Sequence, residues 1–233
     1  MSVHDGHRAR MRERFLRGDL ENFAEHEALE MLLYYCTPRS DTNQLAHRLI
    51  KEFGSLPQVL EATPADLQRV EGVGERIACS LGFFASFCRY YYVRKSQEDG
   101  KILKSVEDCG KYLWPHFMGK QNELVFLLCL DGKGKVLTCK KVGEGSVNSA
   151  AIPVRRIVEL ALTANATMVI LAHNHPSGLA IPSGEDIQTT LTIARALSTV
   201  DVMLDDHLVF SNTDFVSLRE SGYYDARAVH AMN

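Results

Sequence analysis

Two imidazoles, a hydroxyl group and a carboxylate lie within the segment 173–186, which reads HNHPSGLAIPSGED. His173 and His175 follow an apolar run, residues 167–172, that has the β-branched and aliphatic composition of a buried strand. Side chains at positions i and i+2 of a strand lie on the same face. The spacing therefore predicts that both imidazoles point toward one common site, as two ligands of a metal ion would.

The third ligand is predicted in the helix that follows the strand. Pro176 and Gly178 end the strand, and the apolar periodicity of residues 183–198 predicts a helix. Asp186 then lies in the first helical turn, from which its carboxylate can reach back to the strand end. Two histidines and one aspartate leave a fourth tetrahedral position open for water, as in a catalytic zinc site. A capping box formed by Ser183 and Asp186 is the alternative explanation of this spacing.

The order His-x-His, seven residues, Ser-x-x-Asp resembles the signature of the JAMM (MPN+) metalloprotease family. The chain is more similar still to one branch, the RadC-like proteins, which are historically labelled as DNA-repair factors. In the C-terminal half the similar segments are HNHPSG at 173–178, Asp206-His207 within 204–209 and VSLRE at 216–220. In the N-terminal half they are GHRAR at 6–10, PRSDTN at 38–43 and GSL at 54–56.

The resemblance implies an α+β fold with two parts. The N-terminal part is expected to be an all-helical domain with a helix-hairpin-helix, and the C-terminal part a JAMM/MPN-type (cytidine deaminase-like) mixed β-sheet flanked by helices. It also implies Zn²⁺ as the cofactor, held by His173, His175 and Asp186.

Hydrolysis at such a site needs a base, because zinc lowers the pKa of a bound water to about 7 but does not take its proton. In JAMM proteins this base is a glutamate at the start of a strand upstream of the histidines. Glu123, which leads the apolar residues 124–128, occupies the matching position. Glu144 and Glu159 are the competing candidates. Ser183 is expected to donate its hydroxyl to the oxyanion that develops during hydrolysis.

Three further residues lie near the motif. Asn174 lies between the two histidines and is expected to face the other side of the strand, without a catalytic role. RadC-like proteins usually have His-Pro-Arg-Glu where this chain has PVRR at 153–156, so Arg156 replaces the glutamate. Leu179 replaces the aspartate that usually follows Gly178. Both replacements leave the predicted ligands unchanged but alter the charge beside the cleft.

The hydrophobic pattern indicates two domains, residues 1–100 and 101–233, in the 233-residue chain. The first half has helical periodicity, clearest at 27–33 and 44–50, and the polar residues 95–100 form the expected linker. In the second half the patterns predict, in order, strand 123–130, a turn at DGKG, strand 135–142, helix 152–164, strand 167–172, helix 183–198 and strand 202–210.

Composition limits the partners and the location. The net charge of −3 gives no bulk attraction to nucleic acid or to an acidic membrane, so any DNA contact must come from a local patch. No apolar run is long enough to span a bilayer and none opens the chain, so we expect a cytoplasmic protein without a membrane partner. The six cysteines show no Cys-x-x-Cys spacing and are expected to be buried and reduced.

Two features could contact DNA without reading its sequence. The residues around Gly72 and Gly74 resemble a helix-hairpin-helix, whose turn exposes backbone amides to a phosphate. An ordinary helical hairpin is the alternative, because Glu71 and Glu75 would repel a phosphate. The Arg8–Arg17 segment is the other candidate, and a solvated helix face balanced by nearby acidic residues is its alternative.

Together these features predict a zinc-dependent hydrolase of peptide or isopeptide bonds that acts on a protein or peptide substrate. The alternative is a DNA-binding accessory protein of repair or recombination, in which the metal site is structural or vestigial. A metal-dependent nuclease is less favoured, because a single three-ligand site differs from the two-metal clusters typical of nucleases.

Overall fold

The computed structural model describes residues 3–37, 42–96, 101–145, 154–176 and 178–230. The chain forms two compact units, Met1–Cys88 and Arg89–Asn233. Helix α6 (Glu75–Ser96) is continuous across the boundary between them, and residues 97–100 of the predicted linker lie outside the described residues. None of the described helices is both long enough and apolar enough to cross a membrane.

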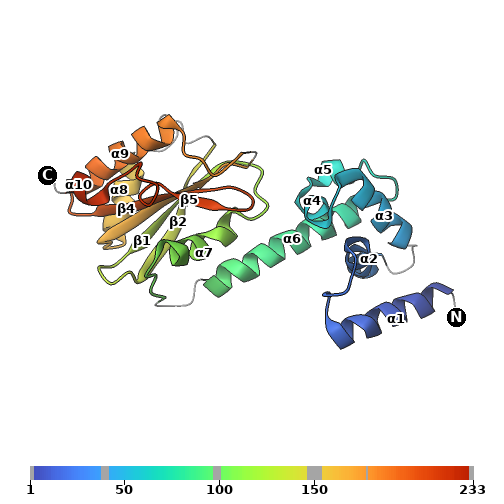
Figure 1. The fold of residues 1–233 in the computed structure, drawn as a ribbon. Helices are drawn as coiled ribbons and strands as arrows, with labels where there is room; N and C mark the ends of the chain where they lie inside the picture. The colour runs from blue at the N-terminus through green and yellow to red at the C-terminus, as the bar shows by residue number, and fades with distance from the viewer. Residues whose placement is uncertain (1–2, 38–41, 97–100, 146–153, 177, 231–233) are drawn as a thin grey trace. The chain divides into compact units, whose positions relative to one another are not determined.

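The first unit is helical throughout its described residues (Figure 1). Its helices are α1 (Val3–Gly18), α2 (Glu25–Cys36), α3 (Thr42–Phe53), α4 (Leu56–Glu61), α5 (Pro64–Leu67) and the first part of α6. Leu29 and Leu33 of α2 pack with Leu49 of α3 in its core, all three fully buried. The amphipathic patterns of the sequence therefore predict these two helices and their buried faces correctly.

The predicted hairpin is the turn between α5 and α6. Gly72 has a φ of 92°, a left-handed conformation that other residues adopt only with strain. Arg48 of α3 holds this turn by donating its Nε–H to the carbonyl oxygen of Glu71. Gly74 has no positive φ, and a Cβ atom built on it meets nothing within 4 Å. The left-handed conformation of this turn therefore depends on Gly72, and the backbone of Gly74 does not require a glycine.

The Arg8–Arg17 segment lies on α1, and several of its guanidinium groups are paired within the unit. Arg14 donates two hydrogen bonds of 2.8 Å to the Glu27 carboxylate. These bonds lower the pKa of Glu27 to about 2. Arg17 forms an exposed ion pair with Glu13 on the same helix. Carboxylates of the same unit thus neutralise two of the five arginines in this segment.

The second unit is built on one five-stranded mixed sheet with strand order β2-β1-β3-β4-β5. Its strands are β1 (Leu124–Leu130), β2 (Val136–Glu144), β3 (Met168–Asn174), β4 (Met203–Phe210) and β5 (Phe215–Ser217). Strand β1 pairs antiparallel with β2 and β3, β3 pairs parallel with β4, and β4 pairs antiparallel with β5. Parallel strands need a long connection, which the segment containing α9 provides between β3 and β4.

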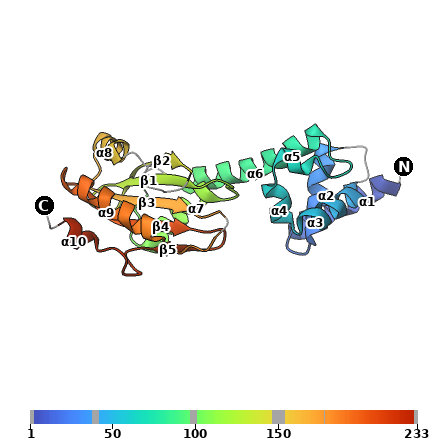
Figure 2. The ribbon, with the colours of Figure 1, turned by 90° about the horizontal axis from the view of Figure 1, so that it is seen from above.

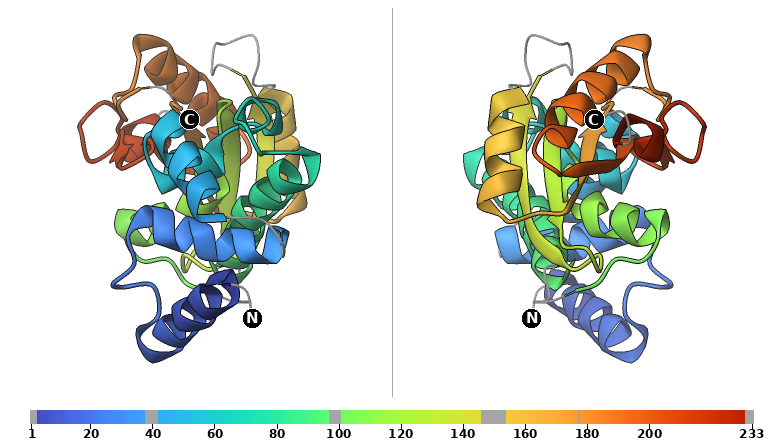
Figure 3. Two further views of the ribbon diagram at one scale, coloured as in Figure 1. Left: turned by 90° about the vertical axis from the view of Figure 1, so that its right-hand side faces the viewer. Right: turned by 90° about the vertical axis from the view of Figure 1, so that its left-hand side faces the viewer.

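Helices cover both faces of this sheet (Figures 2 and 3). The helices of the unit are α7 (Val106–Phe117), α8 (Val154–Thr163), α9 (Gly184–Ser198) and α10 (Ala226–His230), with the last residues of α6 before them. Leu127 and Leu171 face α8 and α9, whereas Leu128 and Phe210 face α7 on the opposite side. The mixed α+β architecture confirms the predicted fold class.

Every strand and helix predicted for this half is present among the described residues, and the ends that lie within them are shifted by at most two residues. The predicted start of the helix 152–164, at residues 152 and 153, lies outside the described residues. The apolar patterns predict neither α7 nor β5 nor α10. The sequence does not predict helix α7 because it contains Gly110 and Pro115, two residue types with low helix propensity. Gly110 lets the Phe215 ring approach, since a Cβ atom at this position would lie 2.3 Å from the ring.

The six cysteines are free thiols, as expected, but they are not all buried. Cys79 and Cys88 are exposed on α6, so the expectation of a buried position is wrong for these two. Their helix carries its apolar core contacts on another face. Cys129 is fully buried in β1, and burial raises the pKa of its thiol to about 12, which makes it unreactive.

Candidate metal centre

The end of β3 brings the two histidines together on one face of the sheet. His173 pairs with Val125 of β1, whose side chain lies on the face covered by α8 and α9. The Nε2 atoms of His173 and His175 lie 2.9 Å apart. His173 is fully buried, whereas 22% of the His175 side chain is exposed. The site is therefore anchored in the core and open to solvent at one edge.

Asp186 lies in the first turn of α9 and is buried. Its Oδ1 atom is 3.3 Å from Nε2 of His173, and its Oδ2 atom is 3.7 Å from Nε2 of His175. Oδ2 also accepts hydrogen bonds of 2.7 Å from both the backbone N–H and the hydroxyl of Ser183. The backbone N–H of Asp186 donates to the Ser183 hydroxyl in return. The capping box and the metal-ligand geometry are thus both present, and they share one carboxylate.

The protonation of His175 follows from its second contact. Its Nδ1 atom lies 3.2 Å from the carbonyl oxygen of Leu179. A carbonyl oxygen can only accept, so the proton of neutral His175 is on Nδ1 and the lone pair is on Nε2. Burial lowers the pKa of His173 well below its usual range and keeps this imidazole neutral. Burial thus favours the metal-binding form of His173, and the Leu179 contact favours the tautomer of His175 that leaves Nε2 free for a metal.

The three donor atoms fit a metal ion. They lie within 4.8 Å of one another, and His173, His175 and Asp186 form a group that can hold a metal. A tetrahedral ion with bonds of about 2.0–2.1 Å needs its donors roughly 3.3 Å apart. Oδ1 of Asp186 is 3.3 Å from Nε2 of His173, and the two Nε2 atoms, at 2.9 Å, are slightly closer than this. Two imidazole nitrogens and one carboxylate suit a divalent transition metal.

Glu123 lies on the same face as the histidines. Strands β1 and β3 are antiparallel, and Val125 lies opposite His173. Two residues further along each strand, just beyond the last paired residues, position 123 therefore lies opposite position 175. Its Oε2 atom is buried and has no hydrogen-bond partner among the described residues. A buried carboxylate oxygen without a partner is uncommon and needs an explanation. An acceptor that receives a proton during a reaction is one such explanation.

The two competing carboxylates are engaged elsewhere. Glu144 at the end of β2 forms a 2.7 Å ion pair with Lys141. Glu159 of α8 forms a 2.7 Å ion pair with Arg155. Both glutamates are exposed, and neither has a buried oxygen that lacks a partner.

Asn174 has a positioning function that the sequence analysis does not assign to it. Its side chain faces away from the histidines, as predicted, and is buried. The Oδ1 atom accepts a 2.7 Å hydrogen bond from the backbone N–H of Leu124, and Nδ2 donates to the carbonyl oxygen of Asn122. These two bonds hold the backbone on both sides of Glu123. An asparagine inside an apolar strand was the only signal for this contact in the sequence.

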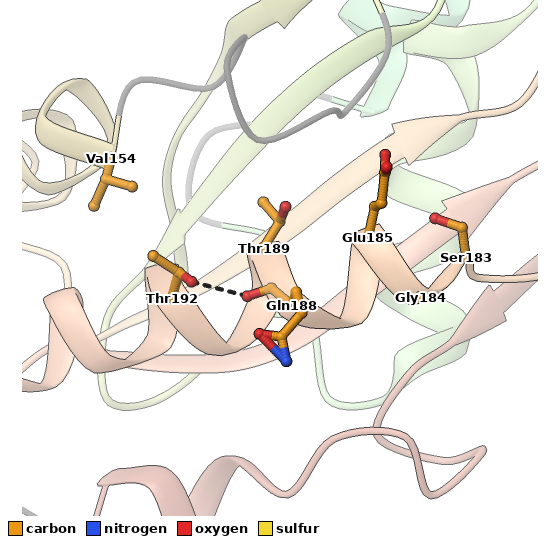
Figure 4. A pocket seen from close by; sticks show the side chains of 7 residues that line it. All are labelled: Val154, Ser183, Gly184, Glu185, Gln188, Thr189 and Thr192. Atoms are coloured by element: carbon orange, nitrogen blue, oxygen red, sulfur yellow. Dashed lines mark hydrogen bonds between the residues drawn. The ribbon is translucent and has the colours of Figure 1, made fainter.

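A cavity of about 740 Å³ runs along α9 from the Ser183 end of the helix (Figure 4). Its described lining residues are Val154, Ser183, Gly184, Glu185, Gln188, Thr189 and Thr192. Arg156, the residue that replaces the usual glutamate, is exposed on α8. Leu179 is 73% exposed beside the histidines. Space for a substrate thus adjoins the metal-ligand group.

A mixed sheet flanked by helices, with two histidines at a strand end and an aspartate in the next helical turn, is the arrangement expected of a JAMM-type domain. The sequence model named RadC-like JAB domain matches residues 103–223, and the model named UPF0758 N-terminal matches residues 6–79. The first match covers more than half of the chain. The chain therefore belongs to the RadC-like JAB domain family, which confirms the resemblance found in the sequence.

Proposed function

We propose that this protein is a zinc-dependent hydrolase of peptide or isopeptide bonds. The observation that carries the proposal is the convergence of His173, His175 and Asp186 on the sheet face that also carries Glu123, whose buried Oε2 has no partner among the described residues. This combination supplies a metal-ligand set and a proton acceptor on one face of the sheet. Membership of a JAB-domain family is consistent with hydrolase chemistry.

The side chains have distinct tasks in the proposed reaction. Zinc, when bound, supplies a Lewis acid that polarises the scissile carbonyl and lowers the pKa of water to about 7. Oε2 of Glu123 accepts the proton of the attacking water and later delivers it to the leaving amine. The Ser183 hydroxyl, which donates to Asp186 in this structure, turns to donate to the developing oxyanion. The Leu179 carbonyl keeps His175 in its metal-binding orientation.

Metal analysis tests the first part of the proposal. Protein prepared with zinc and without chelators is expected to contain about one zinc per chain, because three side chains and one water complete a tetrahedral site. His173→Ala should lose most of this zinc. His26→Ala, which changes a histidine stacked on His47 in the first unit, should retain it. A wild-type protein that carries no zinc would contradict the proposed site.

A second candidate function, binding of duplex DNA without sequence preference, is supported by the left-handed turn at Gly72. We expect the full chain to bind duplex DNA at 50 mM salt, and more weakly by about tenfold at 200 mM if two phosphates are contacted. Fluorescence anisotropy measures both values. Gly72→Val should weaken binding, whereas Gly74→Ala, at an unstrained and open position, should not. Absence of binding at low salt would remove DNA as a partner.

DNA cleavage is a poorer explanation of the metal centre. Among the described residues, one group of histidine, cysteine and acidic side chains can hold a metal ion. Two-metal clusters, which clamp the attacking and leaving oxygens of a phosphodiester, are typical of nucleases.

A further inference from the structure

A third histidine lies directly behind the predicted ligand His173. His207 of β4 is fully buried, and its Nε2 atom is 2.7 Å from Nδ1 of His173. The Nδ1 atom of His207 is 2.6 Å from the hydroxyl oxygen of Thr190 on α9. That hydroxyl is in turn 2.6 Å from the backbone carbonyl oxygen of Asp186. An unbroken series of hydrogen bonds therefore links two of the three predicted ligands through groups that do not touch the site.

The direction of each bond in this series follows from counting protons. The Asp186 carbonyl can only accept, so the single hydroxyl proton of Thr190 lies in that bond. The Thr190 oxygen must then accept from His207, which places the His207 proton on Nδ1. A fully buried imidazole with these two contacts is neutral, so its Nε2 has a lone pair that accepts from Nδ1–H of His173. The remaining lone pair of His173 is on Nε2, the atom that faces His175 and Asp186.

We infer that His207 and Thr190 are positioning residues that fix His173 in the tautomer able to bind a metal. The inference rests on the metal site of the proposed function and extends it to residues outside the ligand set. The series also ties β3, which carries His173, through β4 to α9, which carries Asp186. Ligands from two separate elements are thereby held at one spacing.

Loss of the Thr190 hydroxyl has a specific consequence. The Nδ1–H of His207 would lose its acceptor, so the tautomer with the proton on Nδ1 would no longer be more stable than the tautomer with the proton on Nε2. His207 would then donate to His173, and the proton of His173 would move to Nε2. In that tautomer the proton of His173 must move from Nε2 back to Nδ1, and His207 must return its own proton to Nδ1, before Nε2 of His173 can bind a metal, so the affinity for zinc falls. Partners of this kind typically contribute 10–100-fold to metal affinity.

Zinc affinity, measured by competition with a chromogenic chelator, tests the inference on the full chain. Thr190→Val is expected to weaken zinc binding about 10–100-fold. Thr190→Ser, which restores a hydroxyl, should bring the affinity back to within about threefold of wild type, a recovery that a loss of packing alone does not predict. Thr189→Val is the matched control. Thr189 is the neighbouring buried threonine, and its hydroxyl has no partner among the described residues, so this variant should bind zinc as wild type does.

Nitrogen-15 NMR of the zinc-loaded wild type provides a second readout that needs no variant. The expected result is a proton on Nδ1 of both His173 and His207. A proton on Nε2 of His207, or a Thr190→Val protein with wild-type zinc affinity, would overturn the inference while leaving the metal site intact. A wild-type chain that binds no zinc in the same competition assay would instead overturn the proposed function, and this inference with it.

Discussion

Glu123→Gln is expected to lower the rate of peptide hydrolysis by about 10²–10⁴-fold, the usual contribution of a positioned general base. The amide has nearly the shape of the carboxylate but cannot accept the proton of the attacking water. Zinc content should not change, because Glu123 is outside the group formed by His173, His175 and Asp186. The two measurements are initial rates on a fluorogenic peptide library and zinc per chain by elemental analysis.

Glu159→Gln is the matched control for this variant. Glu159 is a competing glutamate from the sequence, and it forms an exposed ion pair with Arg155. Its replacement should leave both the rate and the zinc content near wild-type values. If Glu123→Gln cleaves peptides normally and Glu159→Gln does not, the general base is Glu159 on α8, and the assignment to Glu123 is wrong.

Asp186→Ala is expected to weaken zinc binding by more than about 100-fold, a larger effect than the removal of a residue outside the ligand set. It should also destabilise the start of α9, because the Asp186 carboxylate accepts two hydrogen bonds from Ser183. Chelator competition gives the zinc affinity, and urea unfolding gives the free energy of unfolding.

Ser183→Ala separates the two functions of this turn. Removal of the hydroxyl takes away the cap on Asp186 N–H and should cost about 1 kcal/mol of unfolding free energy. The carboxylate of Asp186 keeps its backbone bond to Ser183 N–H, so zinc affinity should change far less than in Asp186→Ala. Equal zinc affinities in the two variants would show that Asp186 caps the helix and does not bind the metal.

Local patterns were enough to predict much of the second unit. The apolar runs predict β1, β3 and β4, and the helical periodicity after Ser183 predicts α9, because burial on a sheet face or a helix face leaves a regular signature. The spacing of His173, His175 and Asp186 predicts their convergence, since all three belong to one strand-turn-helix segment. This part of the site could be predicted from the sequence because its three residues are close together in the chain.

Contacts between distant segments could not be predicted in the same way. Asn174 holds residues about fifty positions earlier, and this contact depends on the pairing of β1 with β3. The link from His173 to His207 and Thr190 depends on the parallel pairing of β3 with β4 and on the placement of α9. Helix α7 could not be predicted because Gly110 and Pro115 have low helix propensity, and the close approach of Gly110 to Phe215 is visible only in the folded chain.

Titration of zinc into metal-free protein, with amide-bond and DNA cleavage assayed in parallel, tests the central claim most directly. The substrates are a fluorogenic peptide library, lysine-linked isopeptide conjugates and duplex DNA. Hydrolysis of peptides or isopeptides is expected to rise with added zinc and to level off at about one zinc per chain, while the DNA stays intact. Zinc-dependent cleavage of the DNA, or amide hydrolysis that does not respond to zinc, would contradict the account.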